Sequence, residues 1–142
     1  MKKTKMLKKN YEFKNVLSKG KYYSGRYIEA FIKLNGLQKL NLLGIAISVK
    51  TAKAVKRNRI KRLIRENYKD LENRIKIGNS VVFLWKKKAD IKNATYKNIK
   101  QDMELIFDKA KILIEEKEWK KYLYGLSRNI RYIFQKGLQV EI

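Results

Sequence analysis

The sequence predicts a single α+β domain in which short strands alternate with amphipathic helices. Residues 27–34 alternate between two faces with a period of two, which is typical of a strand. Residues 55–75 keep an apolar period of about 3.6 residues, which is typical of an amphipathic helix. Residues 80–85 are a nearly continuous apolar run, as expected for a buried strand. The 142 residues contain no repeat and no linker, so the length suits one domain of about 100–150 residues.

The first part of the chain is predicted to form a helix and then a loop. Residues 10–18 are expected to be helical because Phe13 and Leu17 lie four residues apart on one apolar face. Gly20 supplies a plausible end to this helix. Residues 20–26 are expected to be a loop because they are rich in glycine and serine.

Three more elements complete the predicted order. They are a strand over 42–49, a helix over 95–114 and a last helix over about 117–136. The expected order is therefore α-β-β-α-β-α plus a tail helix. A third early strand in 36–41 and a bend in the second strand are open alternatives.

Each of the two early strands has one face suited to the core. The expected core faces are Ile28, Ala30, Ile32 and Leu34 on the first strand and Leu43, Ile45, Ile47 and Val49 on the second. The opposite faces are Tyr27, Glu29, Phe31 and Lys33 on the first strand and Leu42, Gly44, Ala46 and Ser48 on the second. If the two strands pair, the smaller residues form a shallow floor edged by Tyr27, Phe31 and Lys33. A large ligand could then lie close to the backbone there.

The charge of the chain indicates a polyanionic partner. There are 36 Lys and Arg residues against 13 Asp and Glu residues, a formal net charge of +23. Binding to phosphates is favoured at such a charge because each contact also releases condensed counterions. A lysine-rich composition without any partner is the alternative.

The composition also excludes most side-chain catalysis. Cysteine and histidine are both absent, which excludes disulfides, thiolate chemistry and a Ser-His or Cys-His nucleophile pair. Zinc sites need Cys or His in nearly all cases. We therefore expect no catalytic side chain and no metal held by the protein alone.

The chain is expected to be cytoplasmic and to have no membrane partner. Its first residues are basic but are not followed by an apolar stretch, unlike a secretory signal. No apolar run approaches the 18 or so residues that a membrane span requires.

The densest basic stretch covers residues 50–65, half of which are Lys or Arg. Four of the eight arginines of the chain lie inside this stretch, in the nine residues from Arg57 to Arg65. Arginine forms bidentate contacts with phosphate, so this local enrichment favours phosphate recognition. Cations at the start of a helix destabilise it through the helix dipole unless a bound anion lies among them. A solvated helix with no partner is therefore the weaker alternative.

Two segments resemble the protein subunit of bacterial ribonuclease P. They are Gly44-Ile45-Ala46-Ile47-Ser48 and Ala54-Val55-Lys56-Arg57-Asn58-Arg59-Ile60-Lys61-Arg62-Leu63-Ile64-Arg65. The resemblance runs from about Leu7 to Leu113 and implies an α-β-β-β-α-β-α fold with a left-handed βαβ crossover. It implies a ribonuclease P protein-like RNA-binding domain over 1–113 and a C-terminal helical extension over 114–142.

The same resemblance implies a function in tRNA processing. The protein would join a catalytic RNA that removes the 5′ leader from precursor tRNA, and that RNA, with its Mg²⁺ ions, would carry out the cleavage. The implied partners are this RNA and precursor tRNA, not DNA. The residues implied to contact the catalytic RNA are Lys50, Lys53, Arg57, Arg59, Lys61, Arg62 and Arg65. The residues expected to bind the leader are Phe13, Leu17, Tyr27, Phe31, Lys33, Ala46, Ser48, Arg57 and Asn58.

The chain departs from the family pattern at two places. Leu17 stands where the family often has an aromatic residue, and Ala52-Lys53 replaces the usual Gly-Asn. Phe13 could belong to the core, and Tyr22 and Tyr23 could either stack on RNA or lie in a mobile loop. The rival functions are a structural RNA-binding protein of ribosomal type, a helix-turn-helix DNA-binding regulator and a metal-dependent nuclease acting alone.

Overall fold

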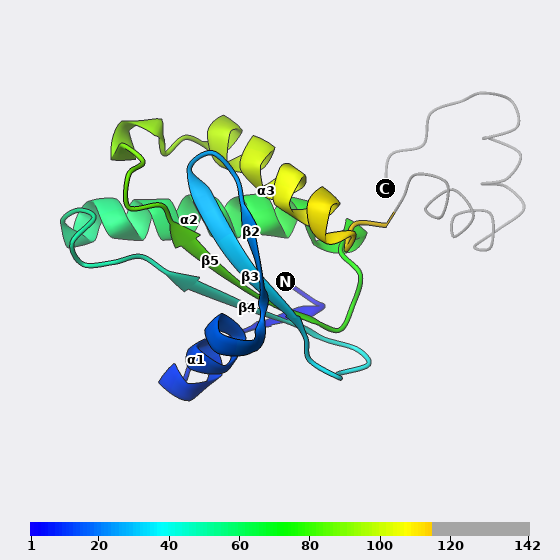
Figure 1. Cartoon of the computed structure of the whole chain (residues 1–142). Helices are drawn as coiled ribbons and strands as arrows, with labels where there is room; N and C mark the ends of the chain where they lie inside the picture. Colours follow the sequence, from blue (N-terminus) through cyan, green and yellow to red (C-terminus); the bar gives the residue numbers. More distant parts are fainter. Residues whose placement is uncertain (115–142) are drawn as a thin grey trace, which may run out of the picture. The chain divides into compact units, whose positions relative to one another are not determined.

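The computed structural model describes residues 1–114, of which Met1–Ile112 form one compact unit. Figure 1 shows the helices packed on a mixed sheet. The strands are β1 (Thr4–Met6), β2 (Lys21–Ser24), β3 (Ile28–Leu34), β4 (Asn41–Ala46) and β5 (Asn79–Trp85). The helices are α1 (Asn10–Lys19), α2 (Ala54–Leu71) and α3 (Tyr96–Ala110), with 3-10 turns at Glu72–Arg74 and Ile91–Asn93.

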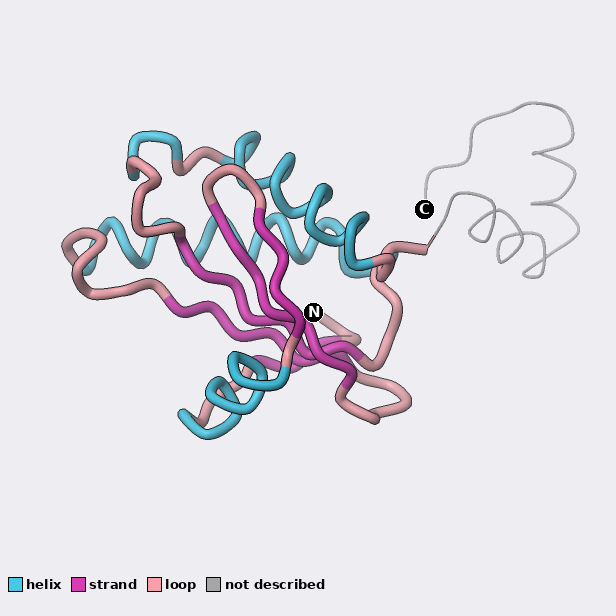
Figure 2. Tube along the Cα trace, in the orientation of Figure 1, coloured by secondary structure: helices cyan, strands magenta, loops and turns pink. Residues whose placement is uncertain are grey.

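The five strands form one sheet in the order β1-β4-β5-β3-β2 (Figure 2). β4 is parallel to β1 and β5, whereas β3 is antiparallel to β5 and β2. From α1 onward the order is α-β-β-β-α-β-α, which confirms the fold implied by the resemblance, and β1 precedes it. The unit β4-α2-β5 is the βαβ connection to which the resemblance attributes a left-handed crossover.

Helices α2 and α3 cover one face of the sheet and α1 packs on the other (Figure 1). The predicted apolar stripe of α2 is confirmed, because Ile60, Ile64 and Tyr68 are all buried. The ring of Phe107 on α3 contacts both Tyr68 and Phe83 of β5. The main core therefore lies between β3, β4, β5 and the two long helices.

Strand β5 confirms the prediction made from its apolar run. It lies at the centre of the sheet, hydrogen-bonded to β3 on one side and to β4 on the other. Val81 and Phe83 face α2 and α3, while Val82 is buried against α1. A strand that is covered on both faces has no solvent-exposed face that needs polar residues, which explains the continuous apolar run of residues 80–85.

Two local predictions were wrong, and one open alternative is not observed. The segment 20–26 is not a loop, because Lys21–Ser24 pairs with β3 and its two tyrosines suit a pleated strand. The alternative of a third early strand in 36–41 is not observed, because only Asn41, the first residue of β4, is in a strand there; the additional strands are β1 and β2. The predicted core residues Leu34 and Val49 are 77% and 74% exposed, because Leu34 is the last residue of β3 and Val49 lies in the turn after β4, which ends at Ala46 rather than at 49.

The two early strands are also not direct neighbours. β5 lies between β3 and β4, so the floor that we expected from their pairing contains a third strand. The pairing is set by the α2 crossover, which returns the chain beside β4. The local alternation of residues predicts that a segment is a strand, but it does not predict which distant strand pairs with it.

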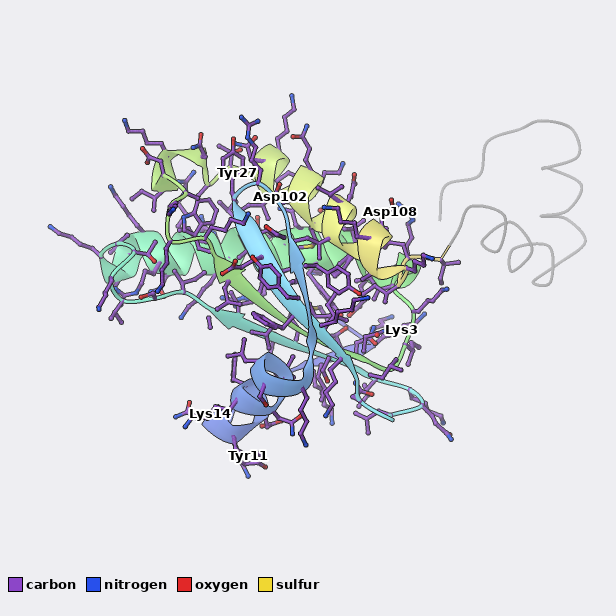
Figure 3. The ribbon with its side chains drawn as sticks, in the orientation of Figure 1. Lys3, Tyr11, Lys14, Tyr27, Asp102 and Asp108 are labelled. Carbon is purple, nitrogen blue, oxygen red and sulfur yellow. The ribbon has the colours of Figure 1, made fainter. Side chains whose placement is uncertain are left out.

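A buried carboxylate on α3 fixes the turn between β2 and β3. Asp102 accepts backbone N–H groups of Arg26 (2.9 Å), Tyr27 (2.6 Å) and Ile28 (3.0 Å). A Cβ at Gly25 would lie 2.7 Å from the Asp102 carboxyl carbon, so glycine allows this close approach. Figure 3 shows Tyr27 and Asp102 close together where the β2–β3 turn meets α3. The hairpin is thereby held to the helix layer.

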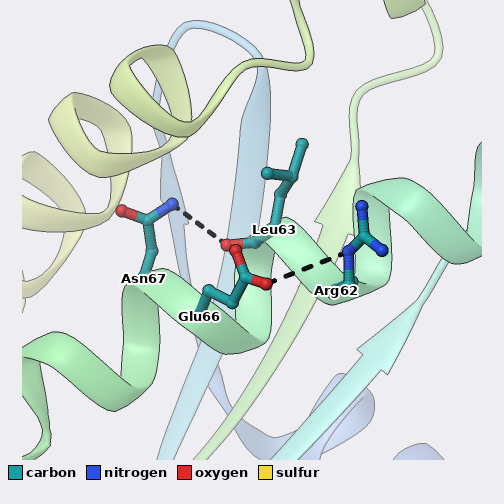
Figure 4. Close-up of polar contacts among 4 residues, drawn as sticks. All are labelled: Arg62, Leu63, Glu66 and Asn67. Atoms are coloured by element: carbon teal, nitrogen blue, oxygen red, sulfur yellow. Dashed lines mark hydrogen bonds and ion pairs between the residues drawn. The ribbon is translucent and has the colours of Figure 1, made fainter.

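Buried polar contacts also join α2 to its neighbours. Asn67 donates to the carbonyl of Leu63 in its own helix (Figure 4) and to that of Tyr96 at the start of α3. The Tyr68 hydroxyl lies 2.9 Å from the Thr4 hydroxyl, and Glu72 accepts the backbone N–H of Lys2. The N-terminal strand is thus attached to the end of α2.

Burial raises the pKa of Tyr68 to about 12, from an ordinary value of 10.0. The folded protein holds this proton more tightly than the unfolded chain does. The contribution to stability is therefore complete below pH 10 and is lost as the pH rises toward 12, by up to about 1.4 kcal/mol per pH unit. Urea unfolding between pH 8 and 11.5 should show a steeper loss of stability for the wild type than for Tyr68→Phe. Equal losses would contradict the assignment.

Candidate nucleic-acid interface

The side of the sheet that faces α1 carries the side chains that the period of two in the strand sequences predicted to lie away from the core. The strand register aligns them in rows. One row is Phe31, Val82 and Gly44, and the next is Glu29, Leu84 and Ala46. β2 extends the first row with Tyr22, which pairs with Phe31. The open sheet face is the part of this surface whose residues are half-buried or exposed: Tyr22, Glu29, Phe31, Ala46 and Leu84.

Helix α1 covers the sheet at Gly44. A Cβ at Gly44 would lie 2.6 Å from the ring of Phe13 and 3.0 Å from Leu7, so the glycine leaves room for these two side chains. Phe13 and Leu17 both pack on the small core formed around Val16 and Val82. At Gly44 itself, side chains of the protein therefore cover the backbone, while Ala46 and Ser48 farther along are half-buried and exposed.

Lys33 lies at the α1 end of β3 and is held in place by that helix. Its ammonium group donates to the Asn15 side chain over 2.7 Å. It borders a small pocket beside Tyr11 and Leu42. Lys33 therefore adds positive charge at one end of the surface, away from α2.

An aromatic pair lies on the open sheet face. The rings of Tyr22 and Phe31 are 5.3 Å apart at 57°. The Tyr22 hydroxyl donates to Glu29 over 2.6 Å, and this hydrogen bond raises the pKa of Tyr22. The pair provides half-exposed π-surface on which unpaired bases can stack.

A wide pocket of about 690 Å³ adjoins this face at the β2–β3 turn. Its lining residues are Arg26, Tyr27, Glu29, Lys86, Lys87, Lys88, Ala89, Asp90 and Asn93. The Tyr27 ring lies parallel to that of Trp85 at 6.2 Å, and the Arg26 guanidinium lies 5.5 Å from the Tyr27 ring centre. Four cationic side chains beside the half-buried Tyr27 ring suit a chain of phosphates and bases.

The basic start of α2 is exposed and has no acidic side chain in its first turn. Lys53 occupies the N-cap position and makes no capping hydrogen bond from its side chain, so the helix amides there are free to bind an anion. The exposed predicted residues are Lys50, Lys53, Asn58, Arg59, Arg62 and Arg65, while Arg57 and Lys61 are half-buried. Arg59 also borders a pocket of about 240 Å³ that contains Lys56 and Lys92.

Arg57 differs from the other arginines because it is bonded within the protein. Its guanidinium donates to the carbonyl of Ala52 over 2.7 Å and is 3.5 Å from that of Val49. Ser48 accepts the Lys50 N–H through its hydroxyl in the same loop. These contacts order the loop that joins the end of β4 to α2, and they leave the loop lysines exposed.

The part of the chain that the structure describes contains no group of three or more metal-binding side chains. Within the same residues no helix is both long and apolar enough to cross a membrane. The predicted helix over 117–136 lies outside the described residues.

Sequence reasoning did not include Tyr22, Arg26 or the lysines 86–88 among the site residues. Tyr22 was considered for stacking on RNA but was left out of the site because its segment was expected to be a loop. The three consecutive lysines directly after the buried strand β5 were a usable signal, since they mark the end of a sheet strand at the surface. Arg26 offered no comparable signal.

The fold and this surface define a class: a basic α+β RNA-binding protein with an open sheet face beside a cationic helix. Residues 1–111 match the family model described as ribonuclease P. The ribonuclease P protein component of Caldanaerobacter subterraneus is 40% identical over 112 residues, covering 79% of this chain and 93% of the relative. That of Clostridium botulinum is 38% identical over 107 residues, covering 75% and 94%.

A solved structure agrees with these relatives. The ribonuclease P protein of Staphylococcus aureus superposes with a TM-score of 0.67 at 30% identity, covering 76% of this chain and 96% of that one. The chain belongs to the bacterial ribonuclease P protein family. Its role is that of the family: it is the protein component of a ribonucleoprotein endoribonuclease, works with the ribonuclease P RNA and serves in maturation of the tRNA 5′ end.

Proposed function

We propose that this protein divides its two RNA contacts between two adjacent surfaces. The open sheet face and the pocket at the β2–β3 turn bind the single-stranded leader of precursor tRNA. The exposed cations of α2 and the preceding loop bind the catalytic RNA. The observation that supports this division is a chemical difference: the sheet face offers aromatic rings, whereas the exposed side of α2 offers cations and no aromatic ring.

The leader is expected to stack on Phe31 and Tyr22 and to follow the strands toward Tyr27. Stacking on aromatic rings tolerates any base, which suits leaders of varied sequence. Lys86, Lys87 and Arg26 supply phosphate contacts at that end. Ala46 and Ser48 border the same path without filling it, because both side chains are small.

The α2 surface is suited to a folded RNA. Arg59, Arg62 and Arg65 are exposed and project from a rigid helix whose other side is buried. Guanidinium groups bind phosphates in a bidentate manner, and the free amides of the helix start add a further anion site. Through its bonds to the loop carbonyls, Arg57 also helps to hold Lys50 and Lys53 beside this surface.

The remaining parts of the proposal follow from family membership. Mg²⁺ is held mainly by the catalytic RNA, and the RNA rather than DNA is the partner. The complex works in the cytoplasm. Residues 1–113 contain every proposed RNA contact, and 114–142 form an extension beyond the family match.

Phe31→Ala tests the leader surface. Loss of one stacking ring should weaken the binding of precursor tRNA to the assembled ribonucleoprotein by about 1–3 kcal/mol. Binding of mature tRNA, which has no leader, should not change. The measurement is the dissociation constant of both RNAs, with Tyr96→Ala as the control because Tyr96 is an exposed ring at the start of α3, to which no RNA contact is attributed. Equal losses for both RNAs would mean that Phe31 acts through folding or through the catalytic RNA.

A further inference from the structure

Glu29 is the only acidic residue in the five described strands. It lies on the open sheet face, between Phe31 and Tyr27, in a protein with a net charge of +23. Among the described residues the one ion pair is Arg62–Glu66, so no described cation forms an ion pair with Glu29. A carboxylate in the middle of an RNA-binding surface repels phosphates, so its presence needs another explanation.

The carboxylate is held in a defined position by one side chain. The Tyr22 hydroxyl donates to its Oε2 at 2.6 Å, and Oε1 has no partner among the described residues. Tyr22 is itself fixed against the Phe31 ring. Glu29 therefore presents a positioned hydrogen-bond acceptor toward the pocket that it helps to line.

The other carboxylate in that pocket has a different role. Asp90 accepts the Lys92 N–H over 2.9 Å and caps a short 3-10 turn. The cations of the pocket are Arg26, Lys86, Lys87 and Lys88. A nucleotide bound there would place its phosphates near these cations and its base edge near Glu29, because the opposite orientation brings two negative charges together.

The four bases differ in what they offer to a carboxylate. Guanine presents two adjacent donors on its Watson–Crick edge, N1–H and the N2 amino group. Adenine and cytosine each present one amino group beside an acceptor nitrogen. Uracil presents one N–H between two carbonyl oxygens, which a carboxylate repels. Unstacked bases in single-stranded RNA are commonly recognised on this edge.

We propose that Glu29 is a specificity-determining residue for the leader. It accepts a hydrogen bond from the base next to the one that stacks on Phe31, and it favours guanine most and uracil least. Phe31 and Glu29 are two positions apart on β3, about 6.6 Å along the strand, a separation that one extended nucleotide linkage can bridge. Tyr22 is the positioning residue for the carboxylate. This inference rests on the proposed binding of the leader to the open sheet face.

The test uses the assembled ribonucleoprotein and a set of precursor tRNAs. Each RNA carries one substitution, so that every leader position near the cleavage site is tried with all four bases. The wild type should prefer guanine to uracil by about tenfold at one position. Glu29→Gln keeps the size of the side chain and an oxygen for Tyr22, and its amide can also donate to a uracil carbonyl. This variant should reduce the preference to about twofold or less and bind uracil-containing leaders more tightly.

Tyr22→Phe is the matched variant for the positioning role. It keeps the ring on Phe31 but removes the bond to Glu29, so the guanine preference should fall while overall leader affinity is nearly kept. A Glu29→Gln complex that retains the full wild-type preference overturns the inference, as does a wild type with no preference at any position.

The experiments also distinguish a failure of the proposed leader surface from a failure of the proposed role of Glu29. If the leader adds nothing to affinity in the wild type, or if Phe31→Ala has no effect on it, both proposals are wrong. If leader affinity depends on Phe31 but no position shows a base preference, only the role of Glu29 is wrong.

Discussion

Asp102→Ala is expected to lower the free energy of unfolding by about 3–5 kcal/mol. Three backbone N–H groups at the β2–β3 turn lose their common acceptor, and at least the one from Ile28 is buried. Unsatisfied buried donors cost their full desolvation free energy, and bonds to a charged acceptor are stronger than neutral ones. The loss is a large part of the total stability of an ordinary domain, about 5–15 kcal/mol.

The measurement is the urea midpoint of the purified protein. Asp108→Ala is the matched control, because Asp108 is an exposed carboxylate on the same helix (Figure 3). It lies near the helix C-terminus, where a negative charge opposes the dipole, so its removal should be neutral or slightly stabilising. Similar midpoints for the two variants would show that Asp102 does not hold the hairpin.

The double variant Arg62→Ala, Arg65→Ala should flatten the salt dependence of binding to the catalytic RNA by roughly one to two units of slope. Each phosphate contact contributes about 0.7–0.9 to the slope of log K against log salt. Both side chains are exposed, and among residues 1–114 the only ion pair found for them is a 3.9 Å contact between Arg62 and Glu66 on the same helix (Figure 4). An exposed pair of this kind contributes little to stability, so folding should be nearly unchanged.

Lys97→Ala, Lys100→Ala is the control for this experiment. It removes the same charge from exposed positions on α3, a helix to which no RNA contact is attributed. Titrations from 50 to 300 mM salt should show the slope change for the arginine variant and not for the lysine variant. Equal slopes in both variants would place the catalytic RNA elsewhere on the protein.

The sequence predicted the helices and strands whose own apolar pattern indicates which of their faces are buried. The stripe of α2 and the run of β5 predicted a one-sided helix and a strand buried on both faces, and both are present. The strand β2 was not predicted, since four residues between two glycines carry almost no periodic signal. Its structure depends on pairing with β3, which local patterns do not reveal.

The site was predictable to a similar degree. Alternation correctly directed Phe31 away from the main core, but nothing local indicated that Phe13 would cover Gly44. The role of Asp102 was missed, although an acidic residue inside the apolar stripe of a helix is itself a signal. Such a residue needs a partner, and here the partner is the turn that positions Tyr27.

Photocrosslinking of the assembled complex tests the division of RNA contacts most directly. A photoreactive benzoylphenylalanine is placed at position 31 in one protein and at position 62 in another, each bound to precursor tRNA and the catalytic RNA. We expect position 31 to crosslink to the 5′ leader and position 62 to crosslink to the catalytic RNA. A crosslink from position 31 mainly to the catalytic RNA, or from position 62 mainly to the leader, would contradict the proposed assignment of the two surfaces.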